Sequence, residues 1–190
     1  MTNNRLRLFI QSVVLCLAST PLLAKDALPL VRFETNRGTI DVELYPERAP
    51  LTVANFLELV DANFYDSLIF HRVIAGFMIQ TGGFDKDLRY RDTEKNVVNE
   101  SPNGLFNKRG YLAMARTSDP DSASSQFFIN VSSNSSLNAR SGRPGYTVFG
   151  KVIDGWKVVE DIELSNTTGK SGVSEALPDE PIIILRARRR

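Results

Sequence analysis

The sequence predicts a mainly β domain, an antiparallel barrel or sandwich with two α-helices at its ends. Short apolar runs of strand length recur along the chain, and clusters of glycine, asparagine and serine separate them. Only two segments show the spacing of an amphipathic helix. The chain has 190 residues, of which 42% are hydrophobic and 24% charged, so its composition is that of one globular domain with one core.

The first 24 residues differ from the rest in composition. Arg5 and Arg7 precede a mostly apolar run, and small residues lead up to Ala24. This order is typical of a secretory signal peptide, and the apolar run is short for a membrane span. We therefore expect cleavage after Ala24. The product is a single domain over 25–190 with no stable membrane anchor and a formal charge of −1, because (23 − 2) − 22 = −1.

A β-hairpin is expected at the start of this domain. Val31 and Phe33, and then Ile40, Val42 and Leu44, fall at period two on either side of an Asn-Arg-Gly turn. An alternation of this kind places one face of the hairpin in the core.

Helical spacing follows the hairpin, with apolar positions at Val53, Phe56, Leu57 and Val60. Pro50 stands near the start of this helix, and Thr52 is the expected N-cap. A second helix is expected in "DGWKVVEDIEL", where Trp156, Val159 and Ile162 share one face.

Strand-like runs fill the middle of the chain: "LIFHRVI", "FMIQTGG", "GYLAMAR", "SQFFINV" and "YTVFGKV". The apolar "EPIIILRA" suits a buried closing strand. We expect the "RARRR" tail to be a solvated, frayed terminus, although contact with anionic lipid or polyanions is an alternative. The sequence shows no internal repeat and no low-complexity linker.

Several classes of function are disfavoured by the residues that such chemistry needs. The chain has one histidine and one cysteine, and Cys16 lies in the expected signal peptide, so no metal site is predicted. It has no GxSxG elbow and no glycine-rich phosphate loop, and a net charge of +1 gives no field for nucleic acid. A hydrolase with His71 as the base of a dispersed triad stays open.

The pair His71 and Arg72 stands inside an apolar segment, "IFHRVIAGFMIQTGGF". Neighbours in a strand point to opposite faces, so we expect the two side chains not to share a groove and His71 to be structural. An arginine among apolar residues needs a partner. Gln80 could hold Arg72 against an apolar surface, or an acid elsewhere in the chain could pair with it, and spacing does not decide between these two interpretations.

Four blocks in order carry a resemblance to a known family. "FHRVIAGFMIQTGG", "NGLFNKRGYLAMAR", "SASSQFFINV" and "GYTVFGKVIDGWKVVEDI" resemble motifs of the cyclophilins, which are peptidyl-prolyl cis-trans isomerases. With the leader, the chain is similar to the periplasmic cyclophilins of Gram-negative bacteria. The resemblance implies a closed eight-stranded antiparallel β-barrel capped by two helices, with its site on the outer wall. It also implies a periplasmic enzyme without cofactor or metal that acts on proline-containing polypeptides, and we expect a monomer.

The resemblance also implies roles for single residues. Arg72 and Gln80 match catalytic positions, Arg72 as the cation that stabilises the twisted amide and Gln80 as the residue that orients it. The matching substrate-binding positions are Phe77, Met78, Ala115, Arg116, Gln126, Phe128, Leu137 and Tyr146. Ser136 stands where an aromatic residue often lines the pocket, so we expect weak cyclosporin binding. Ala75 and Thr81 depart from common residues at positions that concern only backbone geometry.

A binding module that holds proline-containing segments without turnover is the competing interpretation. The presence of both Arg72 and the apolar set favours the enzyme, because a pure binder could dispense with the arginine.

Overall fold

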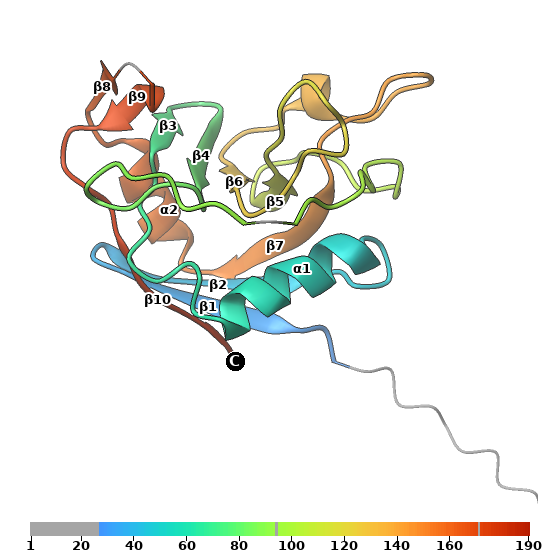
Figure 1. The fold of residues 1–190 in the computed structure, drawn as a ribbon, viewed down its shortest axis with the longest axis horizontal. Helices are drawn as coiled ribbons and strands as arrows, with labels where there is room; N and C mark the ends of the chain where they lie inside the picture. Colours follow the sequence, from blue (N-terminus) through green and yellow to red (C-terminus); the bar gives the residue numbers. More distant parts are fainter. Residues whose placement is uncertain (1–26, 94, 171) are drawn as a thin grey trace, which may run out of the picture.

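A computed structural model describes residues 27–93, 95–170 and 172–190, and the expected signal peptide over 1–24 lies outside the described residues. In Figure 1 four strands, β3, β4, β6 and β5, lie above the other four of the main sheet. The strands are β1 (Leu30–Thr35), β2 (Gly38–Leu44), β3 (Arg72–Ile74), β4 (Met78–Thr81), β5 (Tyr111–Met114), β6 (Phe127–Asn130), β7 (Val148–Asp154), β8 (Thr167–Lys170), β9 (Ser174–Pro178) and β10 (Ile184–Arg189).

Eight strands form one antiparallel sheet in the order β10-β1-β2-β7-β5-β6-β4-β3, and β8 and β9 form a separate hairpin. The predicted hairpin at the start is confirmed, with Val31 opposite Val42 and Phe33 opposite Ile40. The prediction of a closed barrel is overstated, because the edge strands β3 and β10 do not pair. The segment before β3 closes the gap instead: the Phe70 amide donates to the Ile182 carbonyl at 2.9 Å, just before β10, and the amide of Ile184, the first residue of β10, donates to the Leu68 carbonyl at 2.8 Å.

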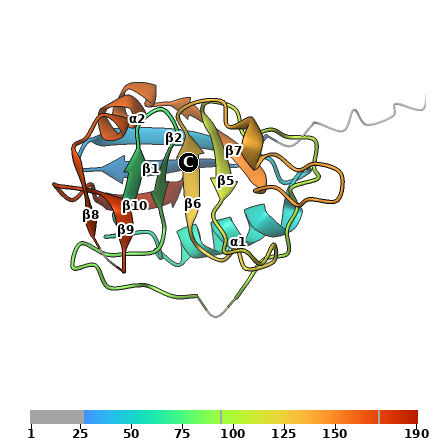
Figure 2. The same cartoon turned by 90° about the horizontal axis from the view of Figure 1, so that it is seen from above.

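Two α-helices, α1 (Pro50–Asp61) and α2 (Trp156–Glu163), lie at opposite edges of the barrel (Figure 2). The prediction that Thr52 is an N-cap is wrong, because the cap is Ala49 and Thr52 lies inside α1. The Glu100 carboxylate accepts the amides of Leu51 at 3.0 Å and Thr52 at 2.8 Å. A carboxylate 48 residues away in sequence therefore satisfies the helix start. No helix in the described ranges is long and apolar enough to cross a membrane.

The barrel interior is filled by side chains, and aromatic rings dominate it. Phe56 of α1 is fully buried, and its ring centroid lies 5.0 Å from Phe149, 5.3 Å from Tyr65 and 5.4 Å from Phe127. Each buried ring of this size contributes about 1.5–3 kcal/mol relative to exposure. Because the interior is packed, a ligand has to bind on the outside of the barrel.

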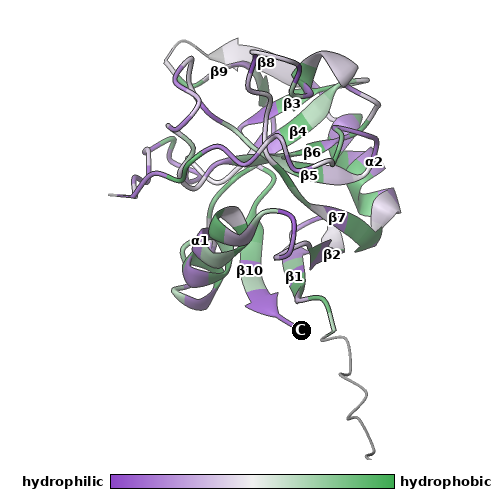
Figure 3. Ribbon diagram, turned by 90° about the vertical axis from the view of Figure 1, so that its right-hand side faces the viewer, coloured by the Kyte–Doolittle hydropathy of each residue, from purple (hydrophilic) through white to green (hydrophobic). Residues whose placement is uncertain are grey.

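The arginine-rich tail is not a frayed terminus, and that prediction is wrong. Residues 184–189 are strand β10, which pairs with β1 along its length. Figure 3 shows the hydrophilic colour confined to the C-terminal end of this strand. The last three arginines each pair with an aspartate: Arg188 with Asp66, Arg189 with Asp61 and Arg190 with Asp41. These arginines therefore form ion pairs within the fold, with aspartates that lie far away in sequence.

Candidate functional site

A second hydrophobic cluster lies on the outer side of the sheet, and we call it the outer cluster. Adjacent residues of β4, β5 and β6 divide between it and the core: Phe128 lies in the outer cluster and Phe127 in the core, as strand alternation requires. Its buried members are Met78, Ala113, Phe128 and Val148, and its partly buried members are Ile74, Phe77, Leu105, Tyr111, Ala115, Leu137 and Tyr146. Six of the eight substrate-binding positions implied by the resemblance come together here, from five separate segments of the chain.

Arg72 lies at the edge of the outer cluster, at the start of β3. Its Nη1 is 3.6 Å from the sulfur of Met78, so one edge of the guanidinium lies over the cluster. The opposite edge is held by Glu175 of β9, whose Oε1 accepts a hydrogen bond from Nε at 2.7 Å and forms an ion pair with Nη2, also at 2.7 Å. The Arg72 side chain is 28% exposed, which leaves it accessible to a ligand. The interpretation in which an acid pairs with Arg72 is confirmed, and the sequence did not single out Glu175.

Gln80 does not hold Arg72, and that prediction is wrong. The two residues are register partners in β3 and β4, but the Gln80 amide donates to Oε1 of Gln126 at 2.9 Å. Gln126 precedes β6, and its side chain fills the space above Gly83, where a Cβ atom would lie 2.6 Å from it. The two glutamines therefore form a fixed polar floor beside the outer cluster.

Arg116 closes the other side of the site. Its guanidinium lies over the Tyr146 ring at 4.6 Å from the centroid and donates to the carbonyls of Pro144 at 3.2 Å and Gly145 at 3.3 Å. The Tyr146 ring in turn packs edge-on against Phe128 at 5.8 Å between centroids. A cation–π contact with three carbonyl acceptors, the third being Thr117 at 2.8 Å, fixes this arginine in place.

His71 is buried and takes no part in the outer cluster. It is 2% exposed, and its ring lies 4.9 Å from that of Phe84. Burial lowers the pKa of His71 to about 4, and the Ile69 carbonyl and the Gln126 side chain offset only part of this effect. Nδ1 has no hydrogen-bond partner among the described residues. The expectation that His71 and Arg72 do not share a groove is confirmed, and a hydrolase based on His71 has no accessible base.

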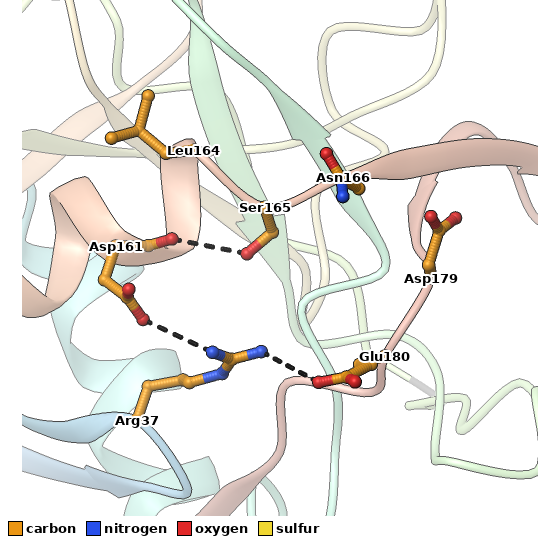
Figure 4. A pocket seen from close by; sticks show the side chains of 7 residues that line it. All are labelled: Arg37, Asp161, Leu164, Ser165, Asn166, Asp179 and Glu180. Atoms are coloured by element: carbon orange, nitrogen blue, oxygen red, sulfur yellow. Dashed lines mark hydrogen bonds and ion pairs between the residues drawn. The ribbon is translucent and has the colours of Figure 1, made fainter.

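Two hollows with charged walls lie outside the outer cluster. One, of about 570 Å³, adjoins the cluster and shares Arg116, Leu137 and Tyr146 with it. The other, of about 460 Å³, lies where Arg37 points between Asp161 at 3.6 Å and Glu180 at 3.3 Å (Figure 4). This second hollow sets Arg37 against three acidic side chains, Asp161, Asp179 and Glu180, and it shares no lining residue with the outer cluster.

The geometry fits binding chemistry better than bond-breaking chemistry. An oriented cation and two fixed amides border an apolar surface that is large enough for a small ring. The guanidinium is a permanent donor that cannot act as a base, and the one histidine is buried. The arrangement can therefore hold an apolar group and stabilise charge or a lone pair that develops next to it.

The family model for "cyclophilin type peptidyl-prolyl cis-trans isomerase/CLD" matches residues 30–189. A peptidyl-prolyl cis-trans isomerase of Acinetobacter baylyi is 49% identical over 156 residues, which cover 82% of each chain. Peptidyl-prolyl cis-trans isomerase A of Dickeya dadantii is 41% identical over 186 residues, which cover 98% of this chain and 97% of the relative.

Among solved structures, the cyclophilin-type isomerase of Cryptosporidium parvum in the presence of the dipeptide Ala-Pro is similar in fold. It superposes with a TM-score of 0.70 at 32% sequence identity, and the match covers 85% of this chain and 98% of that one.

Proposed function

This chain belongs to the cyclophilin-type peptidyl-prolyl cis-trans isomerase family, and from that premise we propose how its own residues turn the Xaa-Pro bond. The enzyme is a peptidyl-prolyl cis-trans isomerase. In the proposed mechanism the outer cluster holds the proline ring, while Arg72 stabilises the twisted amide. The observation that carries it is the guanidinium of Arg72, fixed on one edge by Glu175 and lying on the other edge over Met78.

The outer cluster suits a proline ring because it combines apolar walls with a fixed shape. Met78 and Phe128 are almost fully buried and form its base. Phe77, Leu137 and Tyr146 are partly buried and border the opening. A ring seated there is held against rotation, so the residue before proline moves instead. Gln126 and the backbone of Arg116 would hold that preceding residue.

Arg72 acts on the nitrogen or the carbonyl of the bond that turns. Rotation removes amide conjugation, which is why the uncatalysed barrier is about 18–20 kcal/mol. In the twisted state the proline nitrogen regains a localised lone pair that can accept a hydrogen bond. A charge-assisted bond from Arg72 contributes roughly 1.5–3 kcal/mol. Because this bond forms only when the amide is twisted, it accelerates the reaction rather than only tightening binding.

We also propose where this enzyme works. Residues 1–24 have the layout of a signal peptide, so we place the mature chain in the periplasm as a monomer. Its substrates there would be proline-containing segments of exported proteins that are folding, since uncatalysed proline isomerisation takes tens of seconds. Ser136 lies at the wall of the hollow beside the cluster. A serine gives a bulky macrocycle little apolar contact, so we expect cyclosporin to bind weakly, and nanomolar inhibition would contradict this.

The test is cis-to-trans exchange of a short Ala-Pro peptide at 10 °C, measured with the purified protein and with two variants. Wild-type protein should accelerate exchange, and Arg72→Ala should lower kcat/KM by about 10- to 150-fold, the equivalent of 1.5–3 kcal/mol. His71→Ala, compared per folded molecule, should keep most of the rate. If Arg72→Ala were as active as wild type, the proposed mechanism would be wrong. If wild type gave no acceleration, the chain would instead be a binding module.

A further inference from the structure

The hollow of about 570 Å³ that adjoins the outer cluster has a basic wall, and we call it the basic hollow. It is lined by Arg116, Thr117, Ser118, Pro120, Ser136, Leu137, Arg143, Pro144, Gly145 and Tyr146. Two of these residues are arginines and none is acidic. Because Leu137 and Tyr146 belong to both the hollow and the outer cluster, a peptide with its proline in the cluster has a neighbouring side chain within reach of this wall.

The two arginine side chains differ in whether they already have partners within the protein. Arg116 is fixed over Tyr146 by its bonds to backbone carbonyls. Arg143 is exposed, and no acidic side chain pairs with it within the described ranges. The loop that contributes Pro120 to the same wall carries Asp119 and Asp121, but their carboxylates turn to backbone amides, that of Asp121 at 3.0 Å and that of Asn99 at 2.8 Å, and neither forms an ion pair with Arg143 in the described ranges. Arg143 is therefore a cation without an internal counterion, in contrast to the tail arginines.

The turn that carries Arg143 is held in place. Arg140 and Arg143 exchange backbone hydrogen bonds of 3.0 and 2.9 Å around Gly142, whose φ of 71° suits a tight turn. The base of the turn is pinned where the Gly145 amide donates to Ser101 Oγ at 2.8 Å. A side chain at 145 would not fit, since a Cβ atom there would lie 2.3 Å from the Ala139 nitrogen. The wall is thus preformed.

Arg140 and Arg143 lie opposite each other in the backbone pairing of this turn, but their side chains line different hollows. Arg140 does not face the basic hollow, because it lines another one with Pro102 and Phe106. An anion bound beside Arg143 would supply the counterion that this side chain lacks among the described residues. Ser136, at a position where the resemblance leads us to expect a bulky aromatic residue, leaves room in the hollow for a side chain that carries this anion.

We propose that the basic hollow binds a carboxylate side chain of the substrate next to the proline. This inference rests on the proposed function and names its substrate class: proline-containing segments with an aspartate or glutamate beside the proline. The contact is partly exposed, so it gives a preference of about two- to fivefold rather than strict selection.

The test compares peptides that carry Glu, Gln or Lys immediately before or immediately after the proline. Wild type should have a kcat/KM for the Glu peptide about two- to fivefold above that for the Gln peptide at one of the two positions, and below it for Lys. Arg143→Gln should bring the Glu-to-Gln ratio to about one, and 0.5 M NaCl should lower it. Arg140→Gln, a change of the same kind in the same turn, should keep the ratio.

A ratio of one in wild type, or a preference that survives Arg143→Gln, would overturn the inference. Titration of the same peptides followed by the amide resonances of Gly142 and Arg143 gives the affinity ratio without turnover. If no peptide were isomerised, the proposed function would fail, while the affinity ratio would still decide whether the basic hollow selects a carboxylate.

Discussion

The two faces of β4, β5 and β6 are built from the same kinds of residue but serve different purposes. On the inner face Phe127 and Ile129 pack into a continuous core with α1. On the outer face Phe128 and Met78 pack nearly as tightly, but the cluster that they form ends at partly exposed rings and at Arg72. Burial of the individual residues therefore does not distinguish a site from a core. The distinguishing features are the open border and the oriented cation beside it.

The largest effect should come from truncating adjacent phenylalanines on the two faces. We expect Phe127→Ala to lower the free energy of unfolding by about 3–5 kcal/mol, because it opens a cavity among packed rings. Phe128→Ala should cost about half of that, since solvent can enter its half-open cluster, but it should lower kcat/KM at least tenfold per folded molecule. Urea unfolding and peptide exchange measure the two quantities.

Phe127→Leu serves as a milder variant if Phe127→Ala does not fold. The expected difference between the two faces would be contradicted if both truncations lowered the free energy of unfolding equally, or if Phe128→Ala were fully active.

The next effect concerns the stability of the fold, which should depend on pH through the buried His71. Its folded pKa of about 4 is below the ordinary 6.5, so between these values the unfolded chain binds more protons than the native one. Stability from this group is fully present above pH 6.5 and is lost as the pH falls toward 4, by on the order of 3 kcal/mol. Thermal unfolding between pH 7 and pH 4.5 should show this loss in wild type and a flatter profile in His71→Gln. An equal slope in both would contradict it.

The smallest effect should come from Glu175, which acts on the open face only through Arg72. Its carboxylate is largely exposed, so Glu175→Ala should change stability by less than about 1 kcal/mol. We expect kcat/KM to fall about three- to tenfold, because a released arginine side chain regains up to about 2 kcal/mol of rotamer entropy. Glu175→Gln keeps an acceptor and should recover part of the rate. Glu180→Ala, which removes one of the two acidic partners of Arg37, is the matched control and should leave the rate unchanged.

A direct readout of this orientation is the NMR signal of the Arg72 Nε–H group. It should shift in Glu175→Ala and stay in place in Glu180→Ala. Full activity of Glu175→Ala would show that the ion pair is incidental to catalysis.

Local patterns in the sequence predicted most of the fold. The hairpin around Asn36 and the second helix follow from periodicity within a few residues, and the structure confirms both. The polar segment that forms β8 and β9 shows no alternation, so neither this hairpin nor the place of Glu175 could be expected. Arg72 and Glu175 are 103 residues apart in sequence, and only the tertiary fold brings them together.

Charge was the least reliable guide to local structure. The tail "RARRR" has the composition of a solvated end, yet its partners Asp61 and Asp66 lie more than 120 residues away. The sequence predicts that Gln80 pairs with Arg72, its neighbour in register, whereas the segment before β6 supplies the acceptor that Gln80 uses, Gln126. In both cases a long-range partner decided the outcome.

The pairing of β1 with β10 has a consequence for how the chain is made. On one side β1 pairs with β2, which follows it directly in sequence, and on the other side with β10, where Val31 lies opposite Arg189, so the sheet cannot be completed before β10 has been synthesised. Until then β1 presents an open edge, and Asp61 and Asp66 lack the arginines that pair with them, whereas Asp41 already has Arg32 of β1. Completion of the sheet therefore waits for the last of its strands, and contacts of such long sequence separation make it slow.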